Sequence, residues 1–327
     1  MARQDVKGLV TIVTGASSGV GWQSAVRLGE AGARLCVTAR TVEALERLST
    51  QLRARGIECL VVPGDVTVPE DVERVVRECV AHYGRVDLLV NNAGVQSYGD
   101  FDALPWEHIT RIFETNCFGF MRFARAVLPH FRKQGSGHIL NVQSMLSKGA
   151  APLLSAYTAS KHATLGWANC LELELKTAGI HVSNVLVPSV STNMFAHAPT
   201  LLNKAPQPVP PTYDTDVAAR AVLQCARRPG RTVVPVFLQG WLILAIDTLL
   251  PGLGKFVLSR WGAQMQMREE PVTRHEGNLF QPMVRASGPQ GPVPPTAPWK
   301  RYSVTAGMAA LAGGVLLGAA KLARATR

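Results

Sequence analysis

The sequence predicts an α/β fold with a doubly wound, mainly parallel sheet of roughly seven strands flanked by helices. Three observations support this prediction. Short β-rich runs alternate with longer helical patterns from residue 9 to residue 187, the runs are continuously apolar, and a glycine-rich turn joins the first run to the first helix. Continuous apolar runs are typical of strands buried on both faces, and right-handed crossovers between parallel strands place helices on both sides of the sheet.

The predicted strands and helices follow one another along the chain. Apolar, β-rich runs predict strands over residues 9–13, 34–38, 58–62, 87–90, 138–142 and 181–187. Apolar residues at helical spacing predict helices over residues 19–31, 42–55, 69–83, 106–133 and 155–178. Residues 188–212 contain several prolines and are expected to form a lid over a binding site. A helix over residues 214–227 and a seventh strand over residues 231–237 complete the predicted sheet.

The composition is that of a globular protein. A chain of 327 residues with 47% hydrophobic content can bury a large core, which excludes a disordered chain. The six cysteines are scattered and lack the spacing of a zinc site, so we expect no metal and interpret them as small core residues in a reducing compartment. The N-terminus has no apolar signal segment, and we expect the catalytic part of the chain in the cytoplasm.

The formal charge of +11 is concentrated in the C-terminal part of the chain. Residues 1–200 carry 19 Lys and Arg against 17 Asp and Glu, whereas residues 201–327 carry 15 against 6. Such a basic excess indicates a polyanionic partner, either nucleic acid or an anionic membrane surface. Basic clusters interleaved with aromatic residues are missing, so we expect no nucleic acid and favour membrane contact through the C-terminal third.

The glycine-rich turn is a candidate phosphate site. Thr14-Gly15-Ala16-Ser17-Ser18-Gly19-Val20-Gly21 directly follows the first strand and opens the first helix. Glycines permit a tight turn and close backbone approach, and a helix N-terminus offers free amides and a positive dipole to a pyrophosphate. A turn without a ligand is the alternative, but the strand, loop and helix context favours a dinucleotide held by Gly15, Ser17, Ser18, Gly19, Val20 and Gly21.

Two residues of a predicted helix form a candidate proton-transfer pair. Tyr157 and Lys161 stand four residues apart, which places phenol and ammonium on one helical face, and Ser144 lies thirteen residues upstream of Tyr157. A nearby cation favours the phenolate, so we expect the pKa of Tyr157 to fall from about 10 toward working pH. Such a tyrosine can exchange protons with a carbonyl or an alcohol. The pair alone is common on exposed helices, and only its neighbours make it informative.

Together with Asn91-Asn92-Ala93-Gly94 after the fourth strand, these motifs resemble the short-chain dehydrogenase/reductase family over roughly residues 7–237. The resemblance implies a single-domain Rossmann enzyme that transfers a hydride to or from NAD(P). It implies Tyr157 as general acid/base, Ser144 as hydrogen-bond donor to the reacting oxygen, Lys161 as the partner of the nicotinamide ribose, and Asn116 as the anchor of a relay water. It also implies cofactor contacts at Asn92, Ala93 and Gly94, and adenine contacts at Asp65 and Val66.

The end of the second strand predicts the choice of cofactor. It reads Thr38-Ala39-Arg40, without the acidic residue that would hold ribose hydroxyls. Arg40 offers a forked donor to a 2′-phosphate, so we expect NADP(H); a solvated arginine at a helix start is the alternative. The sequence departs from the family after the sixth strand, where Val187 and Pro188 stand at the usual Pro-Gly positions. The resemblance implies that Thr192 contacts the nicotinamide, and Pro188 makes the loop that carries it stiffer than usual.

The substrate end of the predicted site is apolar. Met194, Phe195 and Leu201 in the lid and Met145 and Leu146 beside Ser144 predict an apolar pocket. We expect a lipophilic ketone, aldehyde or alcohol as substrate of an NADP(H)-dependent oxidoreductase, and the family implies a homodimer or homotetramer. An NADP(H)-binding scaffold or redox sensor without significant turnover is the alternative from another functional class.

Four regions are expected along the chain: a catalytic domain (1–237), an apolar or amphipathic helical extension (238–286), a Pro/Gly linker (287–298) and a candidate membrane-anchor helix (299–327). Residues 238–250 are too short to span a bilayer. Residues 253–267 could lie on a membrane surface, or pack on the domain or on a dimer partner. The uncharged run 303–320 reaches about 27 Å as a helix, and either anchors the chain to the cytoplasmic face of a membrane or forms a soluble tail.

Overall fold

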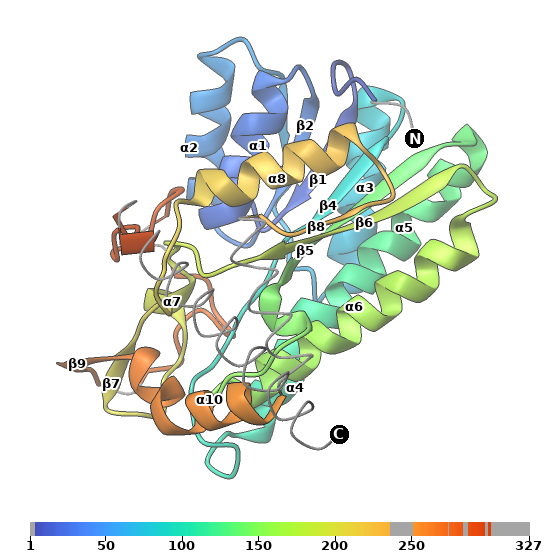
Figure 1. Cartoon of the computed structure of the whole chain (residues 1–327). Helices are drawn as coiled ribbons and strands as arrows, with labels where there is room; N and C mark the ends of the chain where they lie inside the picture. The colour runs from blue at the N-terminus through green and yellow to red at the C-terminus, as the bar shows by residue number, and fades with distance from the viewer. Residues whose placement is uncertain (1–3, 236–250, 274, 284–286, 298–299, 302–327) are drawn as a thin grey trace, which may run out of the picture.

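A parallel sheet forms the centre of the molecule (Figure 1). The computed structural model describes residues 4–235, 251–273, 275–283, 287–297 and 300–301. All pairings in the sheet are parallel and its order is β3-β2-β1-β4-β5-β6-β8. These strands are β1 (Val10–Thr14), β2 (Arg34–Thr38), β3 (Cys59–Val61), β4 (Leu88–Asn91), β5 (Gly137–Ser144), β6 (Ile180–Val187) and β8 (Thr232–Val233). The predicted doubly wound α/β fold is confirmed.

Helices cover both faces of the sheet, as Figure 1 shows. One apolar cluster joins the sheet to α1 (Gly19–Glu30), α2 (Val42–Arg53) and α8 (Thr215–Arg227). A second joins the opposite face to α3 (Pro69–Tyr83), α5 (Gly119–Gln134) and α6 (Ser155–Leu175). Because β1 lies between β2 and β4, the chain winds outward in two directions from this point, and the strand ends on either side leave a crevice suited to a ligand.

The predicted helix over residues 106–133 is wrong as a single element. It divides into α4 (Trp106–Phe113), a π-helical turn η1 (Glu114–Phe118) and α5. Asn116 in the wide turn bonds the backbone of Val95 with its side chain: Oδ1 accepts from the amide at 2.8 Å and Nδ2 donates to the carbonyl at 2.9 Å. Helical periodicity does not reveal one extra residue in a turn, whereas this tertiary contact fixes it.

Other boundaries shift by a few residues. The helix predicted to residue 178 ends at Leu175, and the seventh strand is reduced to Thr232–Val233 within the described residues. The predicted lid contains the short helix α7 (Met194–His197) and β7 (Lys204–Pro206). A 3-10 turn, η2 (Met145–Ser147), follows β5.

The C-terminal extension packs on the catalytic domain. Its helix α10 (Pro251–Met265) leads into β9 (Met267–Pro271), which pairs antiparallel with β7. The predicted linker hydrogen-bonds to the domain along its described part, from Gly19 N to Gly288 O at 2.9 Å and from Thr296 N to Thr212 O at 2.8 Å. No helix in the described ranges combines the length and apolar character that crossing a bilayer requires. The runs 238–250 and 303–320 lie outside those ranges.

Candidate active site

The glycine-rich loop is packed so tightly against the end of β4 that side chains do not fit. A Cβ on Gly15 would lie 2.7 Å from Ala93 Cα, and one on Gly21 would lie 2.4 Å from Gly15 O. Gly15 also has a positive φ of 64°, which glycine adopts without strain. Asn92 Nδ2 donates to Thr14 O at 2.9 Å and to Gly15 O at 3.2 Å. The turn after β1 and the segment after β4 therefore form one rigid floor.

The start of α1 lacks a side-chain cap, although the amide of Gly19 donates to Gly288 O of the C-terminal extension at 2.9 Å. Ser18 precedes the helix without a side-chain cap bond, and the first turn contains no acidic residue. The first amides of a helix carry partial positive charge, so an uncapped start attracts phosphate oxygens. Thr192 lies against the loop: a Cβ added to Gly19 would be only 3.1 Å from Thr192 Cγ2. The loop lines the cavity, and a pyrophosphate that bound at the first turn of α1 would take the place of Gly288 O at the Gly19 amide.

The predicted catalytic side chains meet beside this cradle. Ser144 ends β5, while Tyr157 and Lys161 occupy one face of α6 and are 7% and 3% exposed. Lys161 Nζ lies 5.8 Å from the centre of the Tyr157 ring and 5.1 Å from that of Phe120. Lys161 Nζ also donates to Val142 O at 3.5 Å. The sheet and α6 thus hold a hydroxyl, a phenol and an ammonium around one space.

The expected fall in the pKa of Tyr157 is wrong for this geometry. Burial raises the pKa of Tyr157 to about 12, and the hydrogen bond with the Ser144 hydroxyl opposes this rise. Burial also lowers the pKa of Lys161 to about 8, so the ammonium is itself poorly solvated. The sequence shows the helical spacing of the pair but not its loss of water, and this desolvation dominates. At neutral pH the phenol is protonated and can donate its proton.

Asn116 has a structural role in the described geometry. Its side chain is fully buried, bonds Val95 and donates from Nδ2 to Ser160 Oγ at 3.2 Å. Its backbone carbonyl accepts from Thr164 Oγ1 at 3.0 Å. These bonds join the segment after β4 to α6, and the relay-water role stays a prediction.

One cavity of about 830 Å³ contains the rest of the predicted site. Every predicted site residue other than Gly21 and Asn116 lines it. Gly21 instead supports the loop from beneath. Sequence reasoning missed further lining residues, which come from the segment after β4 and from the C-terminal extension: Gln96, Tyr98, Leu258, Met265, Gln266, Asn278 and Met283. Gln96 and Tyr98 follow Gly94 by two and four residues, so the sequence could have indicated them, whereas nothing in the sequence marks the lining residues of the extension.

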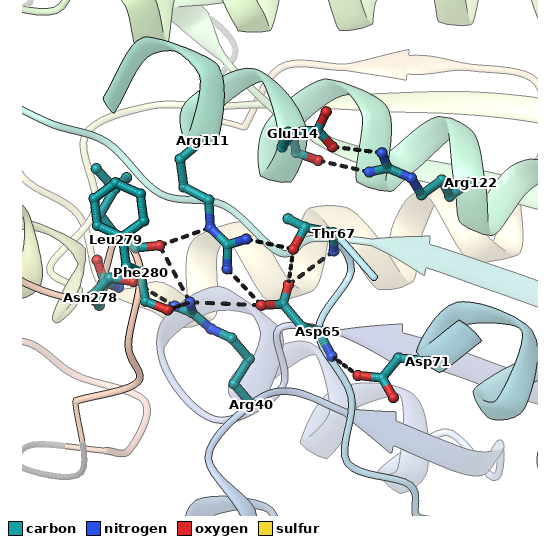
Figure 2. Close-up of polar contacts among 10 residues, drawn as sticks. All are labelled: Arg40, Asp65, Thr67, Asp71, Arg111, Glu114, Arg122, Asn278, Leu279 and Phe280. Carbon is teal, nitrogen blue, oxygen red and sulfur yellow. Dashed lines mark hydrogen bonds and ion pairs between the residues drawn. The ribbon is translucent and has the colours of Figure 1, made fainter. Parts of the chain in front are cut away.

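Charged residues gather at the end of the cavity near β2 (Figure 2). Arg111 Nη2 donates to Asp65 Oδ2 at 2.6 Å, whereas Arg40 Nη1 lies 4.0 Å from the same oxygen. Thr67 donates twice to Asp65 Oδ1, each time over 2.9 Å. The bonds from Thr67 and Arg111 lower the pKa of Asp65 although burial raises it. The carboxylate is therefore fixed within the protein, and Arg40 stays beside the cavity.

Comparisons with known proteins agree with this geometry. The model of the short chain dehydrogenase family matches residues 9–201. An uncharacterized oxidoreductase of Bacillus subtilis is 31% identical over 84% of this chain and 78% of its own length. A dehydrogenase/reductase SDR family protein 7-like of Drosophila melanogaster is 29% identical over 83% and 86%, and a fatty acyl-CoA reductase of Acinetobacter baylyi is 33% identical over 70% and 77%. The chain therefore belongs to the short-chain dehydrogenase family, as an oxidoreductase whose Rossmann fold implies a nicotinamide cofactor.

Proposed function

We propose that the protein is an NADP(H)-dependent reductase that transfers a hydride between the nicotinamide and a carbonyl or alcohol carbon of a lipophilic substrate. The observation that carries the proposal is the shared cavity of Ser144, Tyr157 and Lys161 with the glycine-rich loop. A nicotinamide bound there supplies or accepts the hydride. The side chains of this protein handle the proton and the charge on the substrate oxygen.

Each catalytic side chain has a separate task in this proposal. The protonated phenol of Tyr157, with its pKa raised to about 12, gives its proton to the substrate oxygen as negative charge develops there. The Ser144 hydroxyl donates a hydrogen bond to the same oxygen and stabilises that charge. Lys161 keeps a positive charge near the Tyr157 ring, which favours the phenolate left after proton transfer. Burial of Tyr157 and Lys161 limits the access of water to the phenol and the ammonium and strengthens their interactions.

The preference for NADP(H) rests on the charges around β2. Arg40 lines the cavity, and β2 ends without an acidic residue at this position. Arg111 pairs with the Asp65 carboxylate at 2.6 Å, whereas Arg40 lies 4.0 Å from it. The positive charge of Arg40 is therefore less neutralised by Asp65 than that of Arg111. A positive guanidinium attracts a 2′-phosphate through a forked contact and gives little to a ribose hydroxyl.

The substrate class rests on the apolar end of the cavity. Met145, Leu146 and Phe195 line it on the side of Tyr157, and Leu258 and Met265 of α10 line it as well. The related Acinetobacter baylyi protein is named a fatty acyl-CoA reductase, which agrees with a long apolar chain near the reacting carbonyl. Burial of each methylene of such a chain adds about 0.8 kcal/mol to binding.

A panel of aldehydes and ketones graded by chain length tests this function. With NADPH as reductant, we expect kcat/KM to rise with chain length and to exceed the value measured with NADH. A flat response, or a preference for small charged substrates, would contradict the lipophilic pocket. Faster turnover with NADH would contradict the cofactor assignment and leave the reaction type intact.

We also propose that the C-terminal third brings this pocket to an anionic membrane surface. On α10, Phe256 and Trp261 are 61% and 47% exposed, while Leu258 of the same helix lines the cavity. Flotation with vesicles containing phosphatidylserine should recover the full chain and less of a chain that ends at Pro298. Equal recovery of both chains would oppose a role of residues 299–327.

A further inference from the structure

Five residues of the C-terminal extension dock beside the cofactor end of the cavity. We name residues 276–280 the plug segment. It lies far outside residues 9–201, which the family model covers, and it contacts Arg40, two residues after β2, and Arg111 of α4 (Figure 2). It therefore adds contacts to the cofactor region that the matched part of the chain does not contain.

The plug segment is anchored by apolar and polar contacts. Leu279 is fully buried against Val95, Ile112 and Ala156. Its neighbour Asn278 donates its amide to His197 O at 2.8 Å. Burying a leucine side chain contributes about 1.5–3 kcal/mol, so Leu279 is the main anchor.

A second anchor lies at the start of the plug segment. Glu276 Oε2 is 3.1 Å from His108 Nε2, and the other ring nitrogen of His108 is 3.0 Å from Ser97 Oγ. The ring of Phe280 meets the ring of His108 edge on, with 5.8 Å between the centres. With Leu279, these contacts hold both ends of the segment against α4.

The backbone of the plug segment fixes the guanidinium of Arg40. Arg40 Nη1 donates to Leu279 O at 3.3 Å and to Phe280 O at 3.1 Å, and Nη2 donates to Asn278 O at 2.5 Å. A guanidinium has five N–H groups. Three carbonyls take three of them, and the Nε–H has no protein partner within the described part of the chain. Two N–H groups therefore remain, the Nε–H and one on Nη2, and a forked contact with a phosphate uses two.

Arg111 completes the arrangement. Its Nε donates to Leu279 O at 3.0 Å, its Nη1 donates to Thr67 Oγ1 at 2.6 Å and its Nη2 pairs with Asp65. Arg111 thus joins the plug segment to the loop after β3 that carries Asp65 and Thr67. Two guanidinium groups share one carboxylate here, so one positive charge is left uncompensated beside the cavity, which favours an anion.

We propose that the plug segment is a cofactor-selectivity element that holds Arg40 in place for the 2′-phosphate of NADP(H). The proposal rests on the NADP(H) preference proposed above. Leu279 acts as a positioning residue, because it holds the three carbonyls that restrain Arg40. Without this restraint the long side chain must be ordered anew each time a phosphate binds, at a cost in rotamer entropy.

A double-mutant cycle on the full chain tests the proposal. The dissociation constants of NADPH, NADH and 2′-AMP are measured by calorimetry for wild type, Leu279→Ala, Arg40→Ala and the double variant. We expect Leu279→Ala to weaken NADPH and 2′-AMP binding about tenfold and to leave NADH binding unchanged. In the Arg40→Ala background the same substitution should have no further effect, because the residue through which it acts is gone.

Two substitutions at exposed positions keep the proposal testable if Leu279→Ala fails to fold. The Glu276 side chain is 72% exposed, and Glu276→Ala should weaken NADPH binding about two- to fivefold without unfolding the chain. Glu270→Ala, also exposed at 73% and outside the plug segment, is the matched control and should bind NADPH like wild type.

The outcomes separate this inference from the cofactor assignment. If Arg40→Ala leaves the ratio of NADPH to NADH affinity unchanged, the NADP(H) preference itself fails. If Arg40→Ala lowers that ratio but Leu279→Ala weakens NADPH equally in both backgrounds, the plug segment has a structural role only and the inference fails. Tighter NADPH binding in Glu276→Ala would show that the segment competes with the cofactor, which also overturns the proposal.

Discussion

Replacing Lys161 with methionine should make the folded protein more stable at neutral pH. The ammonium is buried at 3% exposure, with Val142 O as a distant partner at 3.5 Å and aromatic rings around it. Burial lowers the pKa of Lys161 from 10.5 to about 8. The charged form is therefore less favourable in the folded chain than in the unfolded chain. Methionine has a similar length, fills the space and carries no charge.

The size and sign of this effect follow from the pKa difference. At about 1.4 kcal/mol per pKa unit, burial of the charge costs about 3 kcal/mol at pH 7, with a partial offset from the lost bond to Val142. Because the folded pKa lies below the unfolded one, the unfolded chain binds more protons between pH 8 and 10.5. The contribution of Lys161 to the stability of the wild type therefore rises with pH, by about 1 kcal/mol from pH 7 to pH 9.

Urea unfolding at pH 7 and pH 9 measures this difference directly. We expect Lys161→Met to be more stable at pH 7 and to lose about 1 kcal/mol of that advantage at pH 9. The raised pKa values of Cys59 and Tyr157 also make stability depend on pH, but both residues are present in the two chains and their effects cancel in the difference between variant and wild type. Lys176→Met, at an exposed position, removes the same charge and should show neither effect. Equal stability of Lys161→Met and wild type at both pH values would refute the reasoning.

Two further substitutions test the loop and the pocket, with Gly84→Ala as the control for the first. Gly21→Ala should abolish dinucleotide binding and destabilise the fold by about 1–3 kcal/mol, because its Cβ would lie 2.4 Å from Gly15 O. Gly84→Ala meets no atom within 4 Å and should cost only the strain of its φ of 77°, about 1 kcal/mol, in thermal unfolding. Leu258→Trp narrows the cavity and should lower kcat/KM for long-chain substrates at least tenfold, with short ones unchanged; equal losses for both would oppose a chain-length pocket.

The sheet and its helices could be predicted because each has a local signal. The strand predicted over residues 34–38 and the helix predicted over residues 69–83 occur with the same bounds. A continuous apolar run marks the strand, and a proline in the first helical turn with Gly84 after the last turn marks the helix. The catalytic side chains could be placed together because Ser144, Tyr157 and Lys161 follow the glycine-rich turn in the order that resembles the short-chain dehydrogenase/reductase family.

The pKa of Tyr157 and the role of the plug segment depend on tertiary contacts, which the local sequence does not show. The raised pKa of Tyr157 follows from burial under the lid and the extension, which the spacing from Lys161 does not encode. The plug segment is a short polar and aromatic stretch without periodicity, and its importance comes from Arg40, which lies 240 positions from Phe280. The sequence indicated Arg40 as a phosphate ligand but contained no sign of the carbonyls that restrain it.

Turnover of Tyr157→Phe tests the central claim most directly. The phenylalanine keeps the ring and removes only the hydroxyl that gives the proton. The account predicts that kcat for carbonyl reduction falls by about 10²- to 10⁴-fold, while the dissociation constant of NADPH stays within about twofold of wild type. Unchanged turnover with intact NADPH binding would contradict the account and favour a dinucleotide-binding protein whose Tyr157 takes no part in chemistry.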